Sequence, residues 1–534
     1  MNASLILLFG IIVFSIAYKF YSPFIAKILG VEKNRATPAN TMTDGVDYCP
    51  AKAPVLFGHH FASIAGAAPI VGPIIAAAYG WGPVVLWIII GGIFLGGVHD
   101  FGALVVSIHH EGRSIGTVIE NYIGKTGKLL FLFFLWATLV LLIAVFLVVV
   151  AKTFVSVPSA ATASVLFIFL AVLFGIFLYR LKLPLGILSI IGIIFLSICM
   201  IIGWHFPLSL TMQNWITILI VYIFIASVAP VWILLQPRDY LNSFLLYALL
   251  ILAIIGVLVS QPTIELPIFT AWSIPKLGPL FPILFVTVAC GAISGFHSVV
   301  ASGTTSKQLN KESNARPIAY GAMLVECLLA LLALIAVMHL THKYYMAELA
   351  AEGPVTLFSR SLGLFISKLG IDPDHGTRFA ALAVSAFALT TLDTATRLAR
   401  FAFQEFFTST KDKKPSILNT NRFIGTTITV LCAAILAYTG QWKALWPIFG
   451  SANQLLAALA LLTVSLWLKN KKSSSIAIII PMIIMFIITL SALSWLVYEN
   501  LMSENIILTA IGIALFVLAL VLVFEAIKSV FHRA

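Results

Sequence analysis

Charged side chains are scarce in this chain. Asp, Glu, Lys and Arg make up 10% of its 534 residues, whereas 61% of the residues are hydrophobic. An ordinary soluble domain is about one quarter charged and about half apolar. This shortage of charge excludes a chain built of soluble domains. Because apolar runs recur from end to end with short polar spacers, the sequence predicts a single all-α integral membrane domain.

Other common signatures are also missing. The five cysteines, Cys49, Cys199, Cys290, Cys327 and Cys432, show no CxxC spacing, which argues against a zinc ribbon or a disulfide framework. No glycine-rich ATP-binding loop is present, so primary pumping by this chain alone is disfavoured. The net charge is +12, but the basic residues are dispersed over many short loops. Membrane topology explains that charge better than a nucleic-acid partner does, and no nucleic-acid partner is expected.

Apolar runs long enough to cross a membrane are frequent. A spanning helix needs roughly 20 mainly apolar residues. The first run, within MNASLILLFGIIVFSIAYKF, lacks the positive start of a cleavable signal, so we expect it to be a retained spanning helix. Fifteen runs are predicted to span, at 4–26, 55–78, 83–109, 129–151, 163–180, 184–203, 215–235, 240–260, 280–303, 316–340, 379–407, 421–439, 443–468, 476–498 and 506–529.

The distribution of Lys and Arg supports this division. Alternate loops from residue 19 onward hold 25 of the 32 Lys and Arg residues, and the other loops hold 7. Because basic residues accumulate on the cytoplasmic side, we expect an external N-terminus and a cytoplasmic C-terminus. The one sizeable external loop, 341–378, has apolar residues at helical spacing. It is predicted to be an interfacial helix or a lid, with a plain connector as the alternative.

Two of the apolar runs are interrupted by helix-breaking residues. The sequences are ASIAGAAPIVGP at 62–73 and ASVAPVWILLQP at 226–237. At membrane depth such breaks are tolerated only inside protein or beside water. Each break lies in the first of five consecutive spans, and because five is odd the two groups enter the membrane from opposite sides. This arrangement is typical of a 5+5 inverted repeat with discontinuous first and sixth core helices, although Gly and Pro are also simply common in membrane helices.

These breaks define the predicted parts of the chain and its substrate site. The parts are an extra helix at 1–30, a first repeat at 53–205, a second repeat at 213–408 and four C-terminal helices at 420–530. The N-termini of half-helices favour anionic groups. The predicted substrate-binding residues lie at the two breaks and are Ser63, Gly66, Ala67, Pro69, Ser227, Ala229 and Pro230.

Several titratable residues fall at one depth in the inner half of the membrane: His59, His60, His99, Asp100 and His297. Charged groups at such a depth are rare and usually functional. Imidazole and carboxylate groups together suit a proton relay or a metal site, and histidines that bond to carbonyl groups are the structural alternative. His59 and His60 are about 100° apart on an ideal helix, so the two cannot easily chelate one ion.

Hydroxyl groups and two acids complete the candidates for ion coupling. The stretch SGFHSVVASGTTS carries Ser298, Ser302 and Thr304, whose oxygens could hold sodium or could bond their own helix. Glu326 has no local partner, which makes it a candidate for coupling. Asp393 is expected to pair with Arg397, four residues further along a helix.

Four longer motifs resemble a known family. They are GHHFASIAGAAPIVGPIIAAAYGWGP, GGVHDFGALVVSIHHEGRSIG, CGAISGFHSVVASGTTSKQL and ALTTLDTATRLARF, and they are similar to motifs of the carbon starvation protein CstA family over residues 50–465 or so. The resemblance implies a transporter of the bacterial inner membrane with a LeuT-like core, related to the amino acid–polyamine–organocation superfamily. It also implies uptake of peptides or pyruvate coupled to protons.

Two functions are therefore open at this point. The first is a secondary active transporter that imports a small, pyruvate-like carboxylate or short peptides during nutrient starvation, coupled to protons or sodium, without a cofactor and surrounded by membrane lipid. Because no Lys or Arg is expected mid-span, helix dipoles and histidines would bind the carboxylate. The alternative is a membrane-embedded metal-site protein or enzyme with His59, His60, His99, Asp100 and His297 as ligands.

Overall fold

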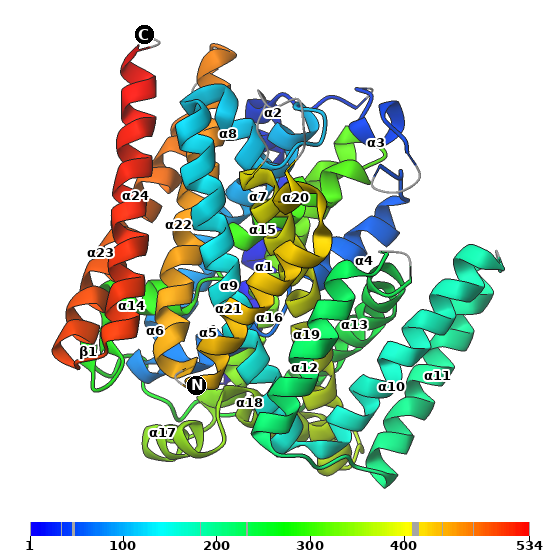
Figure 1. The fold of residues 1–534 in the computed structure, drawn as a ribbon. Coiled ribbons are helices and arrows are strands. Elements are labelled where there is room, and N and C mark those ends of the chain that lie inside the picture. The colour runs from blue at the N-terminus through cyan, green and yellow to red at the C-terminus, as the bar shows by residue number, and fades with distance from the viewer. Residues whose placement is uncertain are drawn as a thin grey trace.

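The computed structural model describes residues 2–33, 35–44, 48–181, 183–230, 233–407, 416–440, 442–473 and 475–532. Its regular structure is almost entirely helical (Figure 1). The helices before residue 261 are α1 (Ala3–Ile16), η1 (Ala17–Tyr21), α2 (Ser22–Leu29), α3 (Pro38–Thr41), α4 (Ala53–Ile64), α5 (Ala68–Ala76), η2 (Ala77–Tyr79), α6 (Trp81–Ile90), η3 (Gly91–Gly96), α7 (Gly97–Ile108), α8 (Ile115–Ile123), α9 (Lys125–Ser156), α10 (Pro158–Gly175), η4 (Ile176–Arg180), α11 (Leu185–His205), α12 (Met212–Val228) and α13 (Leu235–Ser260).

A short antiparallel hairpin follows, in which β1 (Ser273–Ile274) pairs with β2 (Gly278–Pro279). The remaining helices are α14 (Leu280–Thr287), α15 (Gly295–Gly303), η5 (Thr305–Lys307), η6 (Glu312–Asn314), η7 (Arg316–Gly321), α16 (Ala322–Met338), α17 (His342–Ala351), α18 (Pro354–Ser367), α19 (Pro373–Phe406), α20 (Ile417–Thr420), α21 (Arg422–Tyr438), α22 (Trp442–Asn470), α23 (Ile476–Met502) and α24 (Ile506–His532).

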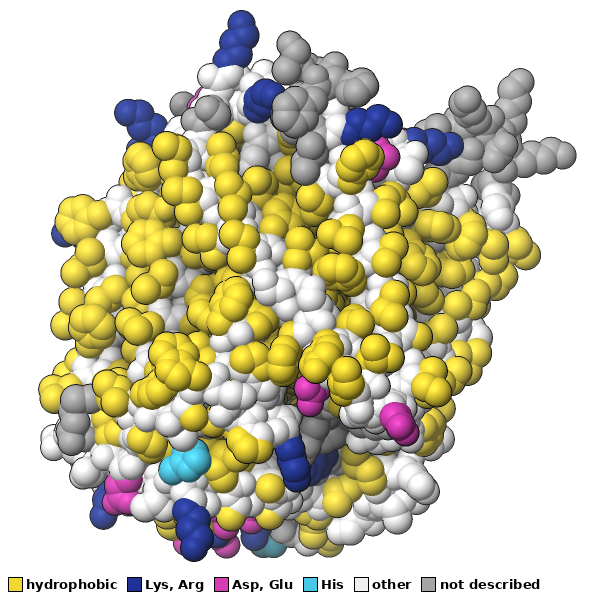
Figure 2. All heavy atoms as spheres, turned by 90° about the vertical axis from the view of Figure 1, so that its left-hand side faces the viewer, with side chains coloured by type: hydrophobic (Ala, Val, Ile, Leu, Met, Phe, Trp, Pro, Cys, Tyr) yellow, Lys and Arg dark blue, Asp and Glu magenta, His cyan; other side chains and the backbone are white. Residues whose placement is uncertain are grey.

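The lengths and apolar composition of these helices suit a membrane protein that crosses the bilayer many times. In the described part of the chain, eleven helices are long and apolar enough to span, or up to twelve if the bent pair α4–α5 is one span. Two shorter apolar helices, α12 and α21, accompany them. The face in Figure 2 carries a broad hydrophobic band, with charged side chains concentrated above and below it. Such a band is what a helix bundle presents to lipid.

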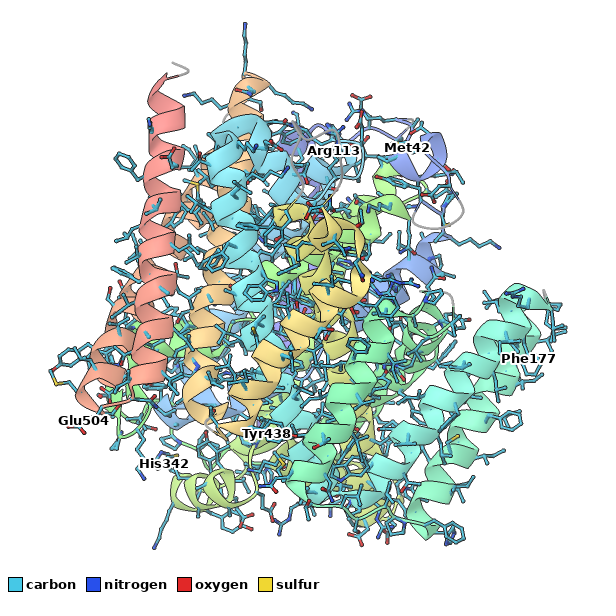
Figure 3. The ribbon with its side chains drawn as sticks, viewed as in Figure 1. Met42, Arg113, Phe177, His342, Tyr438 and Glu504 are labelled. Carbon is cyan, nitrogen blue, oxygen red and sulfur yellow. The ribbon has the colours of Figure 1, made fainter. Side chains whose placement is uncertain are left out.

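The two polar ends of the bundle can be told apart by labelled residues. Met42 and Arg113 lie at one end, and His342 and Glu504 lie at the other (Figure 3). We refer to these as the Arg113 end and the His342 end. The two chain termini also lie toward opposite ends of the bundle (Figure 1).

Two long helices form the centre of the bundle. α9 and α19 pack along each other, and 83% of the apolar stretch of α9 and 94% of that of α19 are buried. By contrast only 22% of the apolar stretch of α11 is buried, and α10 and α11 stand at one edge (Figure 1). The central pair is therefore the interior of the bundle, while α10 and α11 lie at its periphery with many exposed apolar side chains.

The segment 341–378 is helical, as the sequence predicts. Its two helices, α17 and α18, lie at the His342 end, and α18 packs its apolar face on α13 and α19. The hydroxyl of Tyr345 in α17 donates to the carbonyl of Ile74 in α5. Burial raises the pKa of Tyr345, so its phenol remains a protonated donor. This contact ties the segment to the broken span that contains α5.

The predicted break at 62–73 is confirmed. α4 ends at Ile64, α5 begins at Ala68, and the two axes differ by 45°. Gly72 in α5 packs against a second break in another span. A Cβ atom added to Gly72 would stand 2.5 Å from the carbonyl oxygen of Thr287 at that break. Glycine is therefore required where these two backbones meet.

That second break corrects the sequence analysis, which treats 280–303 as one continuous span. The helix stops at Thr287 and resumes as α15 at Gly295. Groups on other helices bind the carbonyls that the break releases: Trp87 donates to Val288, Trp446 to Thr287 and Gln454 to Phe285. Because these donors are distant in sequence, the apolar pattern of 280–303 does not reveal the break.

The two broken spans run in opposite directions. Near the start of α4, the amide of Ala51 donates to the carbonyl of Gln308, which follows α15. At the other end, the hydroxyl of Tyr79 after α5 donates to the carbonyl of Gly278 before α14. The start of each span therefore lies beside the end of the other.

The predicted pairing of 62–73 with 226–237 is corrected by this arrangement. α12 ends at Val228 and α13 starts at Leu235, so 226–237 contains the connection between two separate helices. Residues 231 and 232 lie outside the described residues. The segment that meets the α4–α5 span is instead α14–α15.

Candidate functional site

A chain of buried titratable side chains lies where the two broken spans meet. The Nδ1 atoms of His99 and His297 lie 2.7 Å and 2.8 Å from the two carboxylate oxygens of Asp100. The other ring nitrogen of His297, Nε2, lies 3.3 Å from Oε2 of Glu326. All four side chains are fully buried. We call these four residues the central cluster.

The geometry of the central cluster limits where its protons can lie. If Asp100 is ionised, it accepts from both imidazoles, which requires a proton on each Nδ1. The contact between His297 and Glu326 can then hold one further proton, on either the imidazole or the carboxyl group. Burial makes isolated charges costly, so the titrations of these neighbouring groups are coupled to one another.

Backbone irregularities place these side chains together. His99 and Asp100 open α7 directly after the π-helical turn η3, a kind of irregularity that is frequent at functional sites. A Cβ atom at Gly96 would lie 2.2 Å from the carbonyl oxygen of Ala292, so this glycine lets α7 approach the second break. His297 lies in the first turn of α15, directly after that break.

Asn453 on α22 holds the start of α15 in place. Its side-chain oxygen accepts from the backbone amide of Phe296 at 2.8 Å, and its amide group donates to Ser294 at 3.0 Å. This is the role of an N-cap, supplied here by a different helix. The sequence gives no sign of it because Phe296 and Asn453 are 157 residues apart in the chain.

The vicinal histidines point to different neighbours, as their angular separation on a helix predicts. Nδ1 of His60 lies 2.8 Å from the hydroxyl of Thr305, and this histidine is fully buried. Nδ1 of His59 lies 3.4 Å from Asp239 on α13. His59 also lines a cavity of about 220 Å³ that reaches Cys49 and Gln308 near the Arg113 end.

The metal-site alternative gains no support from these positions. Across the described residues, no group of three or more His, Cys, Asp or Glu side chains is arranged to hold a metal ion. The members of the central cluster bond to one another in a row, and His59 and His60 bond elsewhere. They do not converge on a common point.

A second buried charge cluster lies between α13 and α19. Arg238 contacts Asp393 and the hydroxyl of Tyr222, and its Nη2 donates to Thr390 at 3.1 Å. The hydroxyl of Tyr222 donates to Asp393 at 2.6 Å, and Asn242 donates to Thr390 at 2.9 Å. Arg238 is 3% exposed and Asp393 is 1% exposed.

This second cluster corrects two expectations. Asp393 pairs with Arg238 rather than with Arg397, because Arg397 donates to the carbonyls of Ala226 and Ala229. The expectation that the core holds no cation is also wrong. Arg238 stands near the start of its helix in the sequence, yet the bundle buries it against α19.

The hydroxyl groups proposed for sodium bond their own helix, which was the alternative. Ser298 donates to the carbonyl of Gly295, Ser302 to that of Ser298, and Thr304 to that of Val300. Their oxygens are directed along α15. These contacts favour a structural role for the hydroxyls.

The predicted substrate residues fall into two groups. At the α4–α5 break, Ser63 donates to the carbonyl of His59, and a Cβ atom at Gly66 would lie 2.3 Å from Oγ1 of Thr391. Ala67 and Pro69 are buried beside them at the start of α5.

The second group lies at the end of α12. Ser227 contacts Thr426, the carbonyl of Ala229 accepts from Arg397, and Pro230 is exposed beside it. The described contacts of this group are thus with α19 and α21 rather than with the α4–α5 break.

Comparison with known proteins gives both a family and a fold. The model of the family "Carbon starvation protein CstA" matches residues 2–351 and 346–492. Among solved structures, a manganese transporter of Eremococcus coleocola has a TM-score of 0.53 at 12% identity, covering 91% of this chain and 99% of its own. That likeness concerns the fold.

Curated relatives are similar over nearly the whole chain. "Peptide transporter CstA" of Bacillus subtilis is 33% identical, covering 99% of this chain and 97% of its own length. "Pyruvate/proton symporter BtsT" of Escherichia coli is 31% identical, covering 94% and 82%. This relatedness identifies the chain as a transmembrane transporter rather than an enzyme. The chain belongs to the carbon starvation protein CstA family.

Proposed function

We propose that this protein is a secondary active transporter of the bacterial inner membrane that imports a small, pyruvate-like carboxylate or short peptides during nutrient starvation, coupled to protons. The observation that carries the proposal is the central cluster at the meeting point of two oppositely directed broken spans. The names of the relatives, a peptide transporter and a pyruvate/proton symporter, agree with it.

The chemistry of the central cluster supports proton coupling. His297 lies between Asp100 and Glu326, which belong to different helices, α7 and α16. A proton at the contact of His297 and Glu326 changes the attraction between α15 and α16. Titratable groups buried in this way are typical of proton relays in transporters. Sodium is the alternative coupling ion, but the hydroxyls of α15 bond their own helix.

The substrate site that we propose lies between the α4–α5 break and α19. Thr391 is 2% exposed and, in the described part of the chain, its Oγ1 has no hydrogen-bond partner. It lies beside Gly66, where the amides that open α5 favour a carboxylate. Ser63, Ala67 and Pro69 complete this proposed site. Ser227, Ala229 and Pro230 stand next to Arg397 and would contact substrate on its path.

The proposed architecture is an inverted repeat like that of LeuT. We count fifteen spans by adding the bent pair, the two shorter apolar helices and α14–α15 to the eleven long apolar helices of the described chain. We infer that α4–α5 and α14–α15 are the first helices of the two repeats. The second repeat then contains α14–α15, α16, α19, α21 and α22, and it begins at Leu280 instead of 213. Paired broken helices are the usual substrate site of such folds.

The orientation proposed from the sequence remains unchanged. Basic residues concentrate in the loops at the Arg113 end, which we therefore assign to the cytoplasm. The segment α17–α18 and the N-terminus are then external, and the C-terminus is cytoplasmic. Accessibility of single introduced cysteines to a membrane-impermeant reagent tests this assignment.

Uptake into proteoliposomes tests the function. Purified protein is supplied with labelled pyruvate or a labelled dipeptide under an imposed proton or sodium gradient. We expect a proton gradient to drive uptake and His297→Ala to abolish it while the protein stays folded. The matched control is His375→Ala, because His375 stacks on Trp204 outside the central cluster. Proton-driven uptake by His297→Ala that is unchanged across a pH series would refute the coupling role.

A further inference from the structure

An apolar groove lies on the outside of the bundle between α1, α4 and α16. Its volume is about 370 Å³. Its apolar walls include Ile11, Phe14, Phe57, Leu324, Val325 and Leu328. The outward side of α1 next to it is strongly apolar, with Leu8 42% exposed and Ile12 56% exposed. In a membrane this side faces acyl chains, so the groove opens to lipid.

One end of the groove is marked by a cation on an aromatic ring. Tyr18 and Pro317 line the groove, and the guanidinium of Arg316 lies 5.2 Å from the centre of the Tyr18 ring. Lys19 follows Tyr18 in the chain. Tyrosine and arginine in this arrangement are typical of the level of lipid headgroups.

In the described part of the chain, no acidic side chain neutralises the positive charge of Arg316. Glu312, four residues earlier, is held by Arg35 at 3.1 Å and by His109 at 2.8 Å. Within the described ranges, no carboxylate forms an ion pair with Arg316. Glu312, four residues before Arg316, contacts His109, which is four residues before Arg113. Arg316 therefore lies toward the Arg113 end of the bundle, where the apolar groove meets the polar surface.

We propose that this groove binds one anionic phospholipid, with an acyl chain along α1 and α16 and the headgroup phosphate on Arg316. The two halves of the site match the two halves of such a lipid: a long apolar cleft and an unpaired guanidinium at its polar end. Arginine suits phosphate because its donors form a planar fork. A zwitterionic lipid fits the apolar cleft equally well but brings no net negative charge to Arg316.

The position of the groove gives the lipid a structural role. Phe57 precedes His59 by two residues on α4, and Val325 precedes Glu326 on α16. An acyl chain between them fills the space at the outer side of these two helices. Bound lipid should therefore stabilise their spacing, and this consequence is independent of which substrate is carried.

Lipid binding to the purified full chain tests the proposal. The delipidated protein is titrated with phosphatidylglycerol or phosphatidylcholine, and retained lipid is counted by native mass spectrometry. We expect one phosphatidylglycerol to be retained in preference to phosphatidylcholine. Arg316→Gln should reduce phosphatidylglycerol affinity about fivefold, which corresponds to one basic residue at the membrane surface. It should reduce phosphatidylcholine affinity less, because the choline cation offsets the charge of that phosphate.

A second variant tests the cleft. Gly321 has helical backbone angles, and an added Cβ atom would make ordinary contact at 3.4 Å with the Tyr18 ring. Gly321→Leu should therefore fold, fill the groove and abolish retention of both lipids. Leu324→Trp serves the same purpose if the first variant is not stable. Arg422→Gln is the matched control, since Arg422 also lies on an aromatic ring, that of Phe423, and away from the groove.

The outcomes are distinct. Equal retention of phosphatidylglycerol by the wild type and by a folded groove-filling variant would overturn the proposal. So would a phosphatidylglycerol preference that Arg316→Gln and Arg422→Gln reduce to the same extent.

Discussion

The buried pair Arg238–Asp393 offers a quantitative test of how α13 is held on α19. We consider three variants: Arg238→Met, Asp393→Leu and the double variant. Each replacement is similar in size to the residue it removes. Each single variant leaves one charged group without its partner. That group is almost fully buried, since Arg238 is 3% exposed and Asp393 is 1% exposed.

The expected magnitudes follow from that burial. Removing one partner of a buried ion pair costs about 3–5 kcal/mol of unfolding free energy, because the other charge remains without compensation. Replacing both partners by apolar groups is often close to neutral. Tyr222 and Thr390 would still lose a partner, so we expect a small cost for the double variant. Because the two single costs of about 3–5 kcal/mol each sum to far more than the small cost of the double variant, the coupling energy between the two positions should be at least about 4 kcal/mol.

The assay is a double-mutant cycle on unfolding in mixed detergent micelles. A control cycle on Arg113 and Glu111, whose side chains are 53% and 61% exposed, should give less than about 1 kcal/mol. A third cycle on Asp393 and Arg397 tests the pairing expected from helical spacing, and it should give a smaller coupling than Arg238. Costs for Arg238 and Asp393 that add to within about 0.5 kcal/mol would refute the assigned ion pair.

Two further predictions concern the broken spans. Asn453→Ala leaves the buried amide of Phe296 without its acceptor, so we expect a loss of about 1–3 kcal/mol and slower uptake as His297 moves from Asp100. Thermal unfolding and proteoliposome uptake measure these effects, and wild-type uptake would contradict the positioning role. Tyr345→Phe removes the hydrogen bond from α17 to α5 and should cost about 0.5–1.5 kcal/mol. Hydrogen exchange should then become faster in α17 while α7 stays protected, and unchanged exchange in α17 would argue against the tie.

The central cluster shows which parts of the site can be found in a sequence. His99, Asp100, His297 and Glu326 stand out because titratable residues are rare in apolar runs, and converting chain position into depth places the first three at one level. The contacts among these four side chains cannot be predicted in this way. Asp100 meets His297 because Gly96 admits the carbonyl of Ala292, a contact between residues almost two hundred positions apart.

The sequence by itself determined the membrane class, the helical content, the family and the break at 62–73, because apolar run length, low charge and local Gly–Pro chemistry are properties of neighbouring residues. Only the tertiary structure decided that the partner of this break is α14–α15, that Asp393 pairs with Arg238, and that the hydroxyls of α15 bond their own helix. The first two of these depend on backbones and charges from distant helices, and the third was one of two local alternatives that the sequence left open. A broken helix is stable where other elements bind its released carbonyls, and that support is invisible until the bundle has formed.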